Sequence, residues 1–305
     1  MLHSLRCMSS IEYFKTQKSE FEFAQSNDRI IHFRIKKNWE LHHFLEMHLE
    51  CTGVNYQFLL SLGAVYLNNQ RVENLNSPIQ LNENDYLRVH LCPRRFLING
   101  SKIHDKILYE NNEFIIFKKD HGEPCHPTLD NKIENILYQL KLFQQIQNLY
   151  LCHRLDVGTA GLLIIAKSVN IQNEFMNNWK NVEKIYSAST SGPTLKLGLL
   201  EHWMRPHPRA PKILSSEFVE KWQLCHLEIL KNEKIDLLFN KYEIKLVTGR
   251  THQIRAQLSF ECNPILGDHL YQSPYHLENK DHFMLVCNIL RFNFRNIHYE
   301  FNYTK

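Results

Sequence analysis

The stretch 151–168, which reads LCHRLDVGTAGLLIIAKS, limits what this chain can fold into more than any other. It begins with a charged pair, Arg154 and Asp156, continues through the small residues 158–161, and ends in the apolar run 162–166. A short apolar run of this kind predicts a buried strand. We therefore expect the charged pair to lie in a loop held by a core strand, where catalytic groups are often found. Taken alone, an Arg-x-Asp pair is more often a structural salt bridge.

Taken as a motif, HRLD followed by T-A-G and an apolar strand resembles the catalytic motif of the RluA-like family of RNA pseudouridine synthases. The usual form of that motif is HRLDxxTSGLLLxAK, and Ala160 stands here in place of Ser. TGRTHQIR at 248–255 matches a second motif of the family residue for residue. These two stretches are the most specific matches.

Weaker matches stand in the same order along about residues 106–290. The loop 122–128 resembles the first motif of the family, although Lys118-Lys119-Asp120 precedes it where N-K-P is usual. We expect this loop to support the active-site loop. The strand beginning at Lys184 resembles K-x-Y-x-A, and 263–271 resembles G-x-P-I-x-G-D-x-x-Y with Asn263 in place of Gly. In that last motif we expect Asp268 to be structural.

Composition restricts the partners and the compartment. The net charge of +4 over 305 residues gives no strong basic field, so an RNA site must be a local patch. Eight cysteines without a CxxC, and no HxxxH or HExxH, argue against a zinc site or a disulfide framework. Reduced thiols and a cytoplasmic location are the simplest expectation. No apolar run approaches the roughly 18 residues that span a bilayer, so we expect no membrane segment.

The leading part of the chain predicts a small α+β domain. Residues 1–28 have mixed charge and no clear periodicity, and we expect a partly ordered extension there. Apolar spacing predicts helices near 41–49 and 56–62, and Asn68-Asn69 predicts a tight hairpin turn. Two helices followed by a V-x-L-N-x-Q-x-V hairpin resemble an S4-type RNA-binding domain, assigned to 29–92 and followed by a linker at 93–105.

Charge in this leading domain leaves its role open. Residues 39–62 contain no Lys or Arg, whereas S4-type helices usually carry them. A packing module without RNA affinity is therefore the alternative. The candidates for RNA contact in this domain are Lys36, Lys37, Arg71 and Arg88.

The remainder, 106–305, is assigned to one catalytic domain. Its patterns predict an amphipathic helix in 131–149, a helix capped by Ser168 and running through Trp179, and a loop at 202–212. Two long strands, 217–230 and 234–247, are expected to turn near Asn232, and Thr251 is expected to cap the next helix. Strands at 283–294 and 297–303 close the chain. The expected fold class is α+β: a mixed, mostly antiparallel sheet flanked by helices, behind the small leading domain.

The resemblance implies a reaction and the residues that perform it. Members of the family convert a uridine of ribosomal or transfer RNA to pseudouridine: the N1–C1′ bond is cut, the base turns, and a C5–C1′ bond forms. No redox change or net hydrolysis occurs, so we expect no cofactor and no metal. Asp156 is implied as the catalytic carboxylate, Arg255 as the cation that keeps it ionised, and Tyr186 as the ring that stacks on the target base.

Cationic side chains around these motifs are the candidates for RNA contact. The target uridine must leave its stack, and Arg154 is placed to hold the vacated position or its phosphates. A strand end, a Gly turn and basic residues at a helix start make an anion-binding layout at 246–255, to which we assign Arg250 and His252. The Pro-rich loop has three basic residues and no acid, and the candidates there are Arg205, Arg209 and Lys212.

Two other functions stay open at this point. A noncatalytic RNA-binding or RNA-folding protein on the same scaffold is the main alternative. A hydrolase using Asp156 is the second, although glycosidases usually need two carboxylates at a set distance. The sequence names neither the RNA nor the uridine. A monomer is expected, although no residue pattern decides the oligomeric state.

Overall fold

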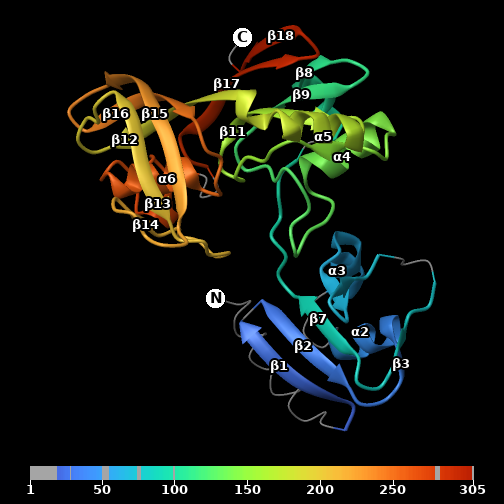
Figure 1. Ribbon diagram of the computed structural model, residues 1–305. Coiled ribbons are helices and arrows are strands. Elements are labelled where there is room, and N and C mark those ends of the chain that lie inside the picture. The colour runs from blue at the N-terminus through green and yellow to red at the C-terminus, as the bar shows by residue number, and fades with distance from the viewer. Residues whose placement is uncertain are drawn as a thin grey trace. The chain divides into compact units, whose positions relative to one another are not determined.

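The computed structural model describes residues 19–27, 29–49, 55–73, 77–98, 100–278 and 282–303. The chain forms two compact units (Figure 1). The first comprises residues 1–96 and 126–138, and the second comprises 97–125 and 139–305. Whether the borders assigned from sequence delimit independent domains stays a prediction.

The first unit contains a five-stranded antiparallel sheet. Its strand order is β1 (Phe21–Asn27), β2 (Ile30–Ile35), β7 (Tyr86–His90), β4 (Val65–Leu67) and β5 (Gln70–Arg71). A small separate ladder joins β3 (Trp39–Glu40) and β6 (Gln80–Leu81). The tight turn at Asn68-Asn69 is confirmed: both residues have positive φ, 50° and 66°, as a short hairpin requires.

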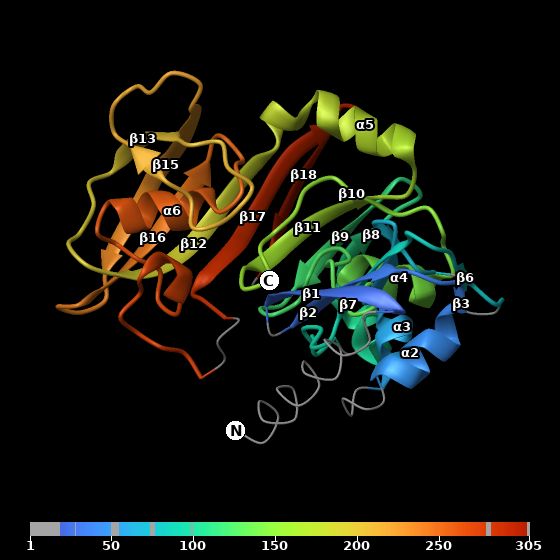
Figure 2. The same cartoon turned by 90° about the horizontal axis from the view of Figure 1, so that it is seen from below.

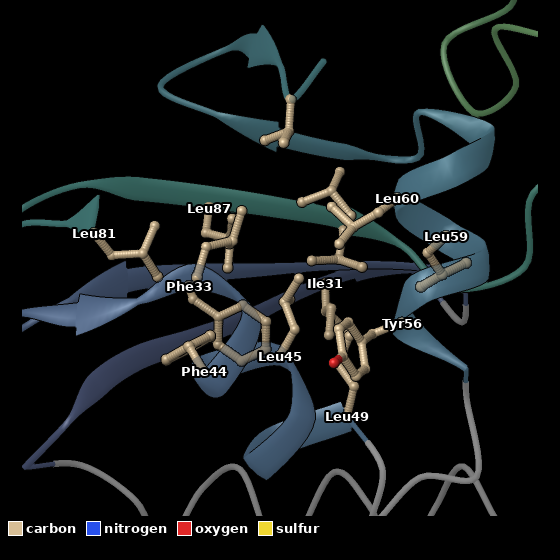
Figure 3. Packing of buried hydrophobic residues seen from close by; sticks show 14 of the residues in the cluster. Ile31, Phe33, Phe44, Leu45, Leu49, Tyr56, Leu59, Leu60, Leu81 and Leu87 are labelled. Atoms are coloured by element: carbon tan, nitrogen blue, oxygen red, sulfur yellow. The ribbon is translucent and has the colours of Figure 1, made fainter. Parts of the chain in front are cut away.

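Both predicted helices of the first unit are confirmed, as α2 (Leu41–Leu49) and α3 (Tyr56–Leu62). Figure 3 shows their apolar side chains meeting those of the sheet, with Phe44 and Leu45 from α2 beside Phe33 of β2. Helical spacing accounts for this contact, because positions three and four apart share one face. The Asn55 side chain caps α3 by accepting the Phe58 amide.

One prediction for this unit is wrong. The sequence predicts an extension over 1–28, but residues 21–27 form β1 and pair with β2. Phe21 is buried, and Phe23 packs against the same core. The period-two pattern of two phenylalanines is too short to detect before the partner strand is known. Residues 1–18 and 28 lie outside the described residues.

The second unit is built on an eleven-stranded sheet, and the prediction of a mixed, mostly antiparallel sheet is confirmed. Nine strands follow the order β14 (Leu214–Ser215), β13 (Gly198–Met204), β15 (Gln223–Lys234), β16 (Phe239–Leu246), β12 (Glu183–Ser191), β17 (Leu285–Phe294), β11 (Ala160–Ala166), β9 (Phe114–Lys119) and β8 (Ile107–Glu110). β10 (Tyr150–Leu151) pairs with β11, and β18 (Ile297–Asn302) pairs with β17. All named pairs are antiparallel except β11 with β17.

The parallel pair lies at the centre of the sheet, where β17 separates β12 from β11 (Figure 2). Gly161 faces Cys287 across it. A Cβ at Gly161 would lie 2.5 Å from the backbone nitrogen and oxygen of Cys287, and φ at Gly161 is 130°. A glycine is therefore required where the HRLD loop enters its strand.

Helices cover this sheet locally. α6 (Gln253–Phe260) lies against β13 and β15, and the Gln257 amide donates to the Leu200 and Cys225 carbonyls. α5 (Val169–Asn177) runs along β11 (Figure 1) and is capped by Ser168, as predicted. The helix predicted over 131–149 is shorter, α4 (Ile136–Gln144). No helix in the described part of the chain is long and apolar enough to cross a membrane.

Three further predictions need correction. The loop predicted over 202–212 begins later, because 202–204 belong to β13. The hairpin predicted to turn near Asn232 turns at 235–238, where Asp236 accepts the Leu238 and Phe239 amides. Thr251 does not cap α6: His252 is the N-cap residue, in the left-handed conformation.

Candidate active site

The buried side chain of Lys119 holds the loop that carries Asp156. Lys119 Nζ donates to the carbonyl oxygens of Asp120 at 2.9 Å, Val157 at 2.9 Å and Thr159 at 2.6 Å. Two of these carbonyls, of Val157 and Thr159, follow Asp156 in the loop. Burial lowers the pKa of Lys119 from 10.5 to about 8, while nearby Cys125, Glu123 and Asp156 oppose that fall. The ammonium is thus kept by its acceptors in a site with almost no solvent.

The loop 122–128 contributes a second support, as the sequence predicted. The Gly122 amide donates to the Val157 carbonyl at 2.8 Å. The Cys125 thiol lies 3.4 Å from the Leu155 nitrogen, which donates to it, and 3.3 Å from the Leu155 oxygen, to which it donates. These contacts fix the backbone on both sides of the carboxylate, at Leu155 before it and at Val157 after it. Asp156 is therefore presented on a loop with little freedom.

The carboxylate of Asp156 meets Arg255 from α6. Arg255 Nη1 donates to Asp156 Oδ2 at 2.8 Å, while Asp156 retains 25% side-chain exposure. Another edge of the guanidinium binds Asp268, with Nε to Oδ2 at 2.6 Å and Nη2 to Oδ1 at 2.9 Å. Asp268 is buried, with 1% side-chain exposure. A two-point contact of this kind fixes the plane of a guanidinium.

The charge and position of Arg255 follow from these partners. Burial opposes the charge, but Asp268 and Asp156 outweigh it and raise the pKa of Arg255 above its usual value. Two aromatic rings also flank the guanidinium carbon, Phe283 at 4.4 Å and Tyr271 at 5.0 Å from their centroids. The structure thus places a fixed cation beside an accessible carboxylate.

His252 lies near the same carboxylate oxygen of Asp156 as Arg255. Its Nε2 is 3.7 Å from Asp156 Oδ2, and its Nδ1 is 3.2 Å from the Tyr271 hydroxyl. Burial lowers the pKa of His252, and Arg255 adds to this effect, while Asp156 and Asp268 oppose it. His252 takes φ of 59° because the chain turns there into α6. At this turn the Arg250 amide donates at 3.0 Å to the side chain of Gln253, not of Thr251.

Tyr186 stands on β12, directly across from Cys287 on β17. Its ring is buried, and its hydroxyl bonds to the Cys287 thiol. Burial, Cys287 and the charge of Asp156 raise the pKa of Tyr186 well above 10.0. The Tyr186 hydroxyl is therefore neutral near pH 7 and can donate a proton, next to the aromatic face of its own ring.

The remaining predicted cations occupy the exposed surface of the second unit. The Arg154 and Arg250 side chains are exposed. Arg205 and Arg209 are exposed as well, in the loop 205–213 between β13 and β14, which we call the basic loop. The Lys212 ammonium donates to the His207 carbonyl within this loop, and the Lys212 amide donates to the Tyr271 hydroxyl at 3.0 Å. The structure therefore joins Lys212 and His252 through Tyr271, a motif position to which the sequence assigned no role.

Most candidate cations of the first unit have partners within it. Lys37 binds Glu20 at 2.8 Å, and Lys36 lies 3.5 Å from Glu22. Arg71 Nη2 donates at 2.7 Å both to the Tyr66 hydroxyl and to the Thr128 carbonyl.

Arg88 also lies over the ring of Tyr66. Its guanidinium carbon is 4.3 Å from the Tyr66 ring centroid. Binding of RNA by this unit would have to compete with these internal contacts.

Departures from the motifs are accommodated structurally. Ala160 is fully buried in β11. Asn263, also fully buried, accepts from Thr190 Oγ1 at 3.3 Å and from the Tyr242 hydroxyl at 3.2 Å, and donates to the Glu261 carbonyl at 3.0 Å. The positive φ of this turn falls on Cys262, at 57°. Asn263 thus replaces Gly without needing a conformation that disfavours a side chain.

Comparison with known proteins gives matches to RNA pseudouridine synthases. Residues 113–260 match the profile of the family described as RNA pseudouridylate synthase. The chain is 30% identical over 213 residues to RNA pseudouridine synthase 6, chloroplastic, of Arabidopsis thaliana, covering 61% of this chain and 44% of that protein. It is 27% identical over 171 residues to ribosomal large subunit pseudouridine synthase D of Haemophilus influenzae, covering 54% and 52%. The chain thus spans about half the length of these curated relatives.

Solved structures agree on the fold. The chain superposes on human RNA pseudouridylate synthase domain containing 1 with a TM-score of 0.51 and 22% identity, covering 65% of this chain and 82% of that one. For human RNA pseudouridylate synthase domain containing 4 the TM-score is 0.50, with 21% identity and coverage of 63% and 86%. With its motifs in order and its profile match across 113–260, the chain is similar in sequence to RNA pseudouridylate synthases, and these solved structures share its fold.

Proposed function

We propose that this protein is an RNA pseudouridine synthase that uses the Asp156 carboxylate to isomerise uridine in RNA. The observation that carries the proposal is the ion pair between Arg255 Nη1 and Asp156 Oδ2 at 2.8 Å, inside the two most specific motifs of the family. The carboxylate is accessible and its loop is held by Lys119. A fixed cation next to a nucleophile lowers the cost of arranging charge during the reaction.

The proposed roles follow from position. Asp156 attacks or supports the reacting sugar or base, and Arg255 pairs with it and holds its orientation. Tyr186 stacks on the base after it leaves the helix, and its protonated hydroxyl can donate but cannot act as a base near pH 7. Arg154 and Arg250, with the basic loop, supply the charge that attracts phosphates.

For the substrate we propose ribosomal RNA of the large subunit. Support comes from several relatives named ribosomal large subunit pseudouridine synthase D. Transfer RNA is the alternative that the family allows. We propose further that the first unit is S4-like and assists RNA binding, and that the protein works as a monomer in the cytoplasm. The six cysteines in the described part of the chain are free, which suits a reducing compartment.

Two other functions were left open by the sequence. A hydrolase would need a second carboxylate free to act, but Asp268, which shares Arg255 with Asp156, is buried in a two-point contact. A noncatalytic RNA-binding protein would not need Asp156 to be both accessible and paired. The proposed enzyme accounts for both features.

Pseudouridine mapping of total RNA, from cells with and without the gene, tests this function. We expect the loss of one or a few pseudouridines and their return when the wild-type gene is restored. Restoring the gene as Asp156→Ala should not return them. Sites returned by that variant would support a binding or folding role instead.

A further inference from the structure

Tyr271 connects two parts of the proposed site that the sequence treats separately. It lies in the short 3₁₀ turn His269–Tyr271, with 4% exposure. Its hydroxyl oxygen lies 3.0 Å from the Lys212 backbone nitrogen in the basic loop and 3.2 Å from His252 Nδ1 at the start of α6. One buried atom therefore touches both the loop and the residue beside Asp156.

The hydrogen-bond directions follow from counting donors. The Lys212 amide donates, so it takes one acceptor position on the Tyr271 oxygen. A buried hydroxyl proton needs an acceptor of its own. Within the described residues, His252 Nδ1 is the acceptor in reach of that proton. We therefore assign the proton of neutral His252 to Nε2, which faces Asp156 Oδ2 at 3.7 Å.

The same side chain also supports Arg255. The Arg255 guanidinium carbon lies 5.0 Å from the Tyr271 ring centroid, and Ala256 of the same helix packs on the ring. The Tyr271 carbonyl accepts from Ser259 Oγ at 2.9 Å, which fixes the turn to α6. Ring and hydroxyl thus have separate partners, so the two contributions can be separated by substitution.

The basic loop has few other attachments to the site. Its neck is closed by the Arg205 amide, which donates to the Ile213 carbonyl at 2.9 Å. Inside the loop, the Arg209 amide donates to His207 Nδ1 at 3.1 Å. These bonds lie within the loop. Among the described residues, the Lys212 amide makes the backbone contact between the loop and the turn that carries Tyr271.

We propose that Tyr271 is a positioning residue that ties the basic loop to His252 and Arg255, so that RNA held by the loop and the carboxylate of Asp156 are arranged together. This inference rests on the proposed function for its kinetic consequences. Its structural half, the tether between loop and helix, is independent of any activity.

The variant Tyr271→Phe removes the hydroxyl and keeps the ring beside Arg255. Without the tether, the loop has more conformations to lose when RNA binds, so KM should rise. The proton of His252 is no longer fixed on Nε2, so kcat should fall. Together we expect kcat/KM for pseudouridine formation to fall roughly tenfold, the effect of losing one or two hydrogen bonds.

Tyr242→Phe is the matched control. Tyr242 is equally buried, and its hydroxyl accepts the Leu195 amide at 3.0 Å and lies 3.2 Å from Asn263 Oδ1, so the control also loses buried hydrogen bonds. It should leave kcat, KM and the basic loop unchanged. A merely structural role for Tyr271 predicts that both variants behave alike.

The experiment has two parts, on the full chain. Deuterium uptake of the 205–213 segment is measured first; three of its nine residues are prolines without an amide, so Lys212 contributes a large share of the signal. We expect faster uptake in Tyr271→Phe and no change in Tyr242→Phe. Pseudouridine formation on an RNA carrying the mapped site then gives kcat and KM.

Faster uptake together with changes in both KM and kcat supports the proposal. Unchanged uptake overturns the tether, and faster uptake with unchanged kinetics overturns the coupling. A wild type that modifies no RNA would overturn the proposed function, and with it the kinetic half of this inference. The uptake result would still decide whether Tyr271 holds the loop.

Discussion

Arg255 holds Asp156 with a single nitrogen, Nη1 at 2.8 Å, while its Nε and Nη2 bind a second carboxylate. The second carboxylate is Asp268, bound through Nε and Nη2 and almost wholly buried. Asp268 thus fixes the guanidinium through Nε and Nη2, and Nη1 binds Asp156. This asymmetry explains how Asp156 keeps a fixed cation and still remains accessible to a substrate.

Removing the anchor should therefore weaken both stability and activity. In Asp268→Asn, Arg255 keeps its charge but loses its buried counter-ion, and we expect unfolding free energy to fall by about 3 kcal/mol. With the guanidinium displaced, kcat should fall by about 10²-fold. Urea unfolding and a pseudouridine assay measure the two effects. Glu174→Gln, which removes the charge from an exposed pair with Arg295, should leave both stability and kcat nearly unchanged. Equal effects in the two variants would contradict the anchoring role.

The buried ammonium of Lys119 gives a pH-dependent prediction. Its pKa is about 8 in the folded protein and near 10.5 in the unfolded chain, so the unfolded state binds more protons between these values. Stability from this group therefore grows as pH rises from about 8 to 10.5 and is lost again as pH falls. Lys119→Met lacks this contribution and leaves loop carbonyls without their donor.

The difference in unfolding free energy between wild type and Lys119→Met isolates the group, because all other titrations are shared. It should favour the wild type at pH 7 and widen on going to pH 10, by up to roughly 3 kcal/mol over the full range. Guanidinium unfolding at several pH values measures it. A gap that stays constant with pH would show that Lys119 titrates normally in the folded protein.

Tyr186 should act through its ring and as a hydroxyl donor. Tyr186→Phe keeps the stacking face, so KM should change little while kcat falls; Tyr186→Leu should lose a further 1–3 kcal/mol, approximately, in kcat/KM. Because the pKa of Tyr186 is raised well above 10.0, its phenolate is absent near neutral pH. A wild-type kcat that rises towards pH 10, with the rise absent in Tyr186→Phe, would instead show Tyr186 acting as a base.

The basic loop should contribute phosphate contacts without sequence preference. Arg205→Ala and Arg209→Ala should each weaken RNA binding and reduce the slope of log K against log salt by about 1. Lys234→Ala, at an exposed position at the end of β15, is the charge-matched control and should leave the slope unchanged. Binding titrations at several salt concentrations provide the slopes. Identical slopes for all variants would place the RNA away from this loop.

Local patterns predicted the parts of this fold that local physics decides. The spacing of Leu41, Phe44 and Leu45 defined α2, the cap at Ser168 located the start of α5, and the motif strand became β12. Motif order also indicated that Asp156 and Arg255 would meet, although 99 residues separate them. That contact came from the family resemblance, because no local pattern specifies it.

Long-range contacts account for what the sequence did not predict. In the sequence, Lys119 is one of two neighbouring lysines at the end of a predicted strand. Only the paired strands show that its side chain points inward and binds the loop that carries Asp156. Asp268 and Tyr271 were recognised as motif positions, but their partners lie on α6 and in the basic loop, which meet them only in the folded chain. The Asn232 turn was displaced because Asp236 provides the better local acceptor for a hairpin.

The central claim is that Asp156 is the catalytic carboxylate of an RNA pseudouridine synthase. The most direct measurement compares purified wild type and Asp156→Asn on the same RNA, by counting pseudouridine formed in single turnovers. We expect product with the wild type and a rate reduced by about 10⁴-fold or more in the variant, with RNA affinity retained. Stability should change little, because Arg255 keeps Asp268 as its partner. Pseudouridine formed at a wild-type rate by Asp156→Asn would contradict the claim.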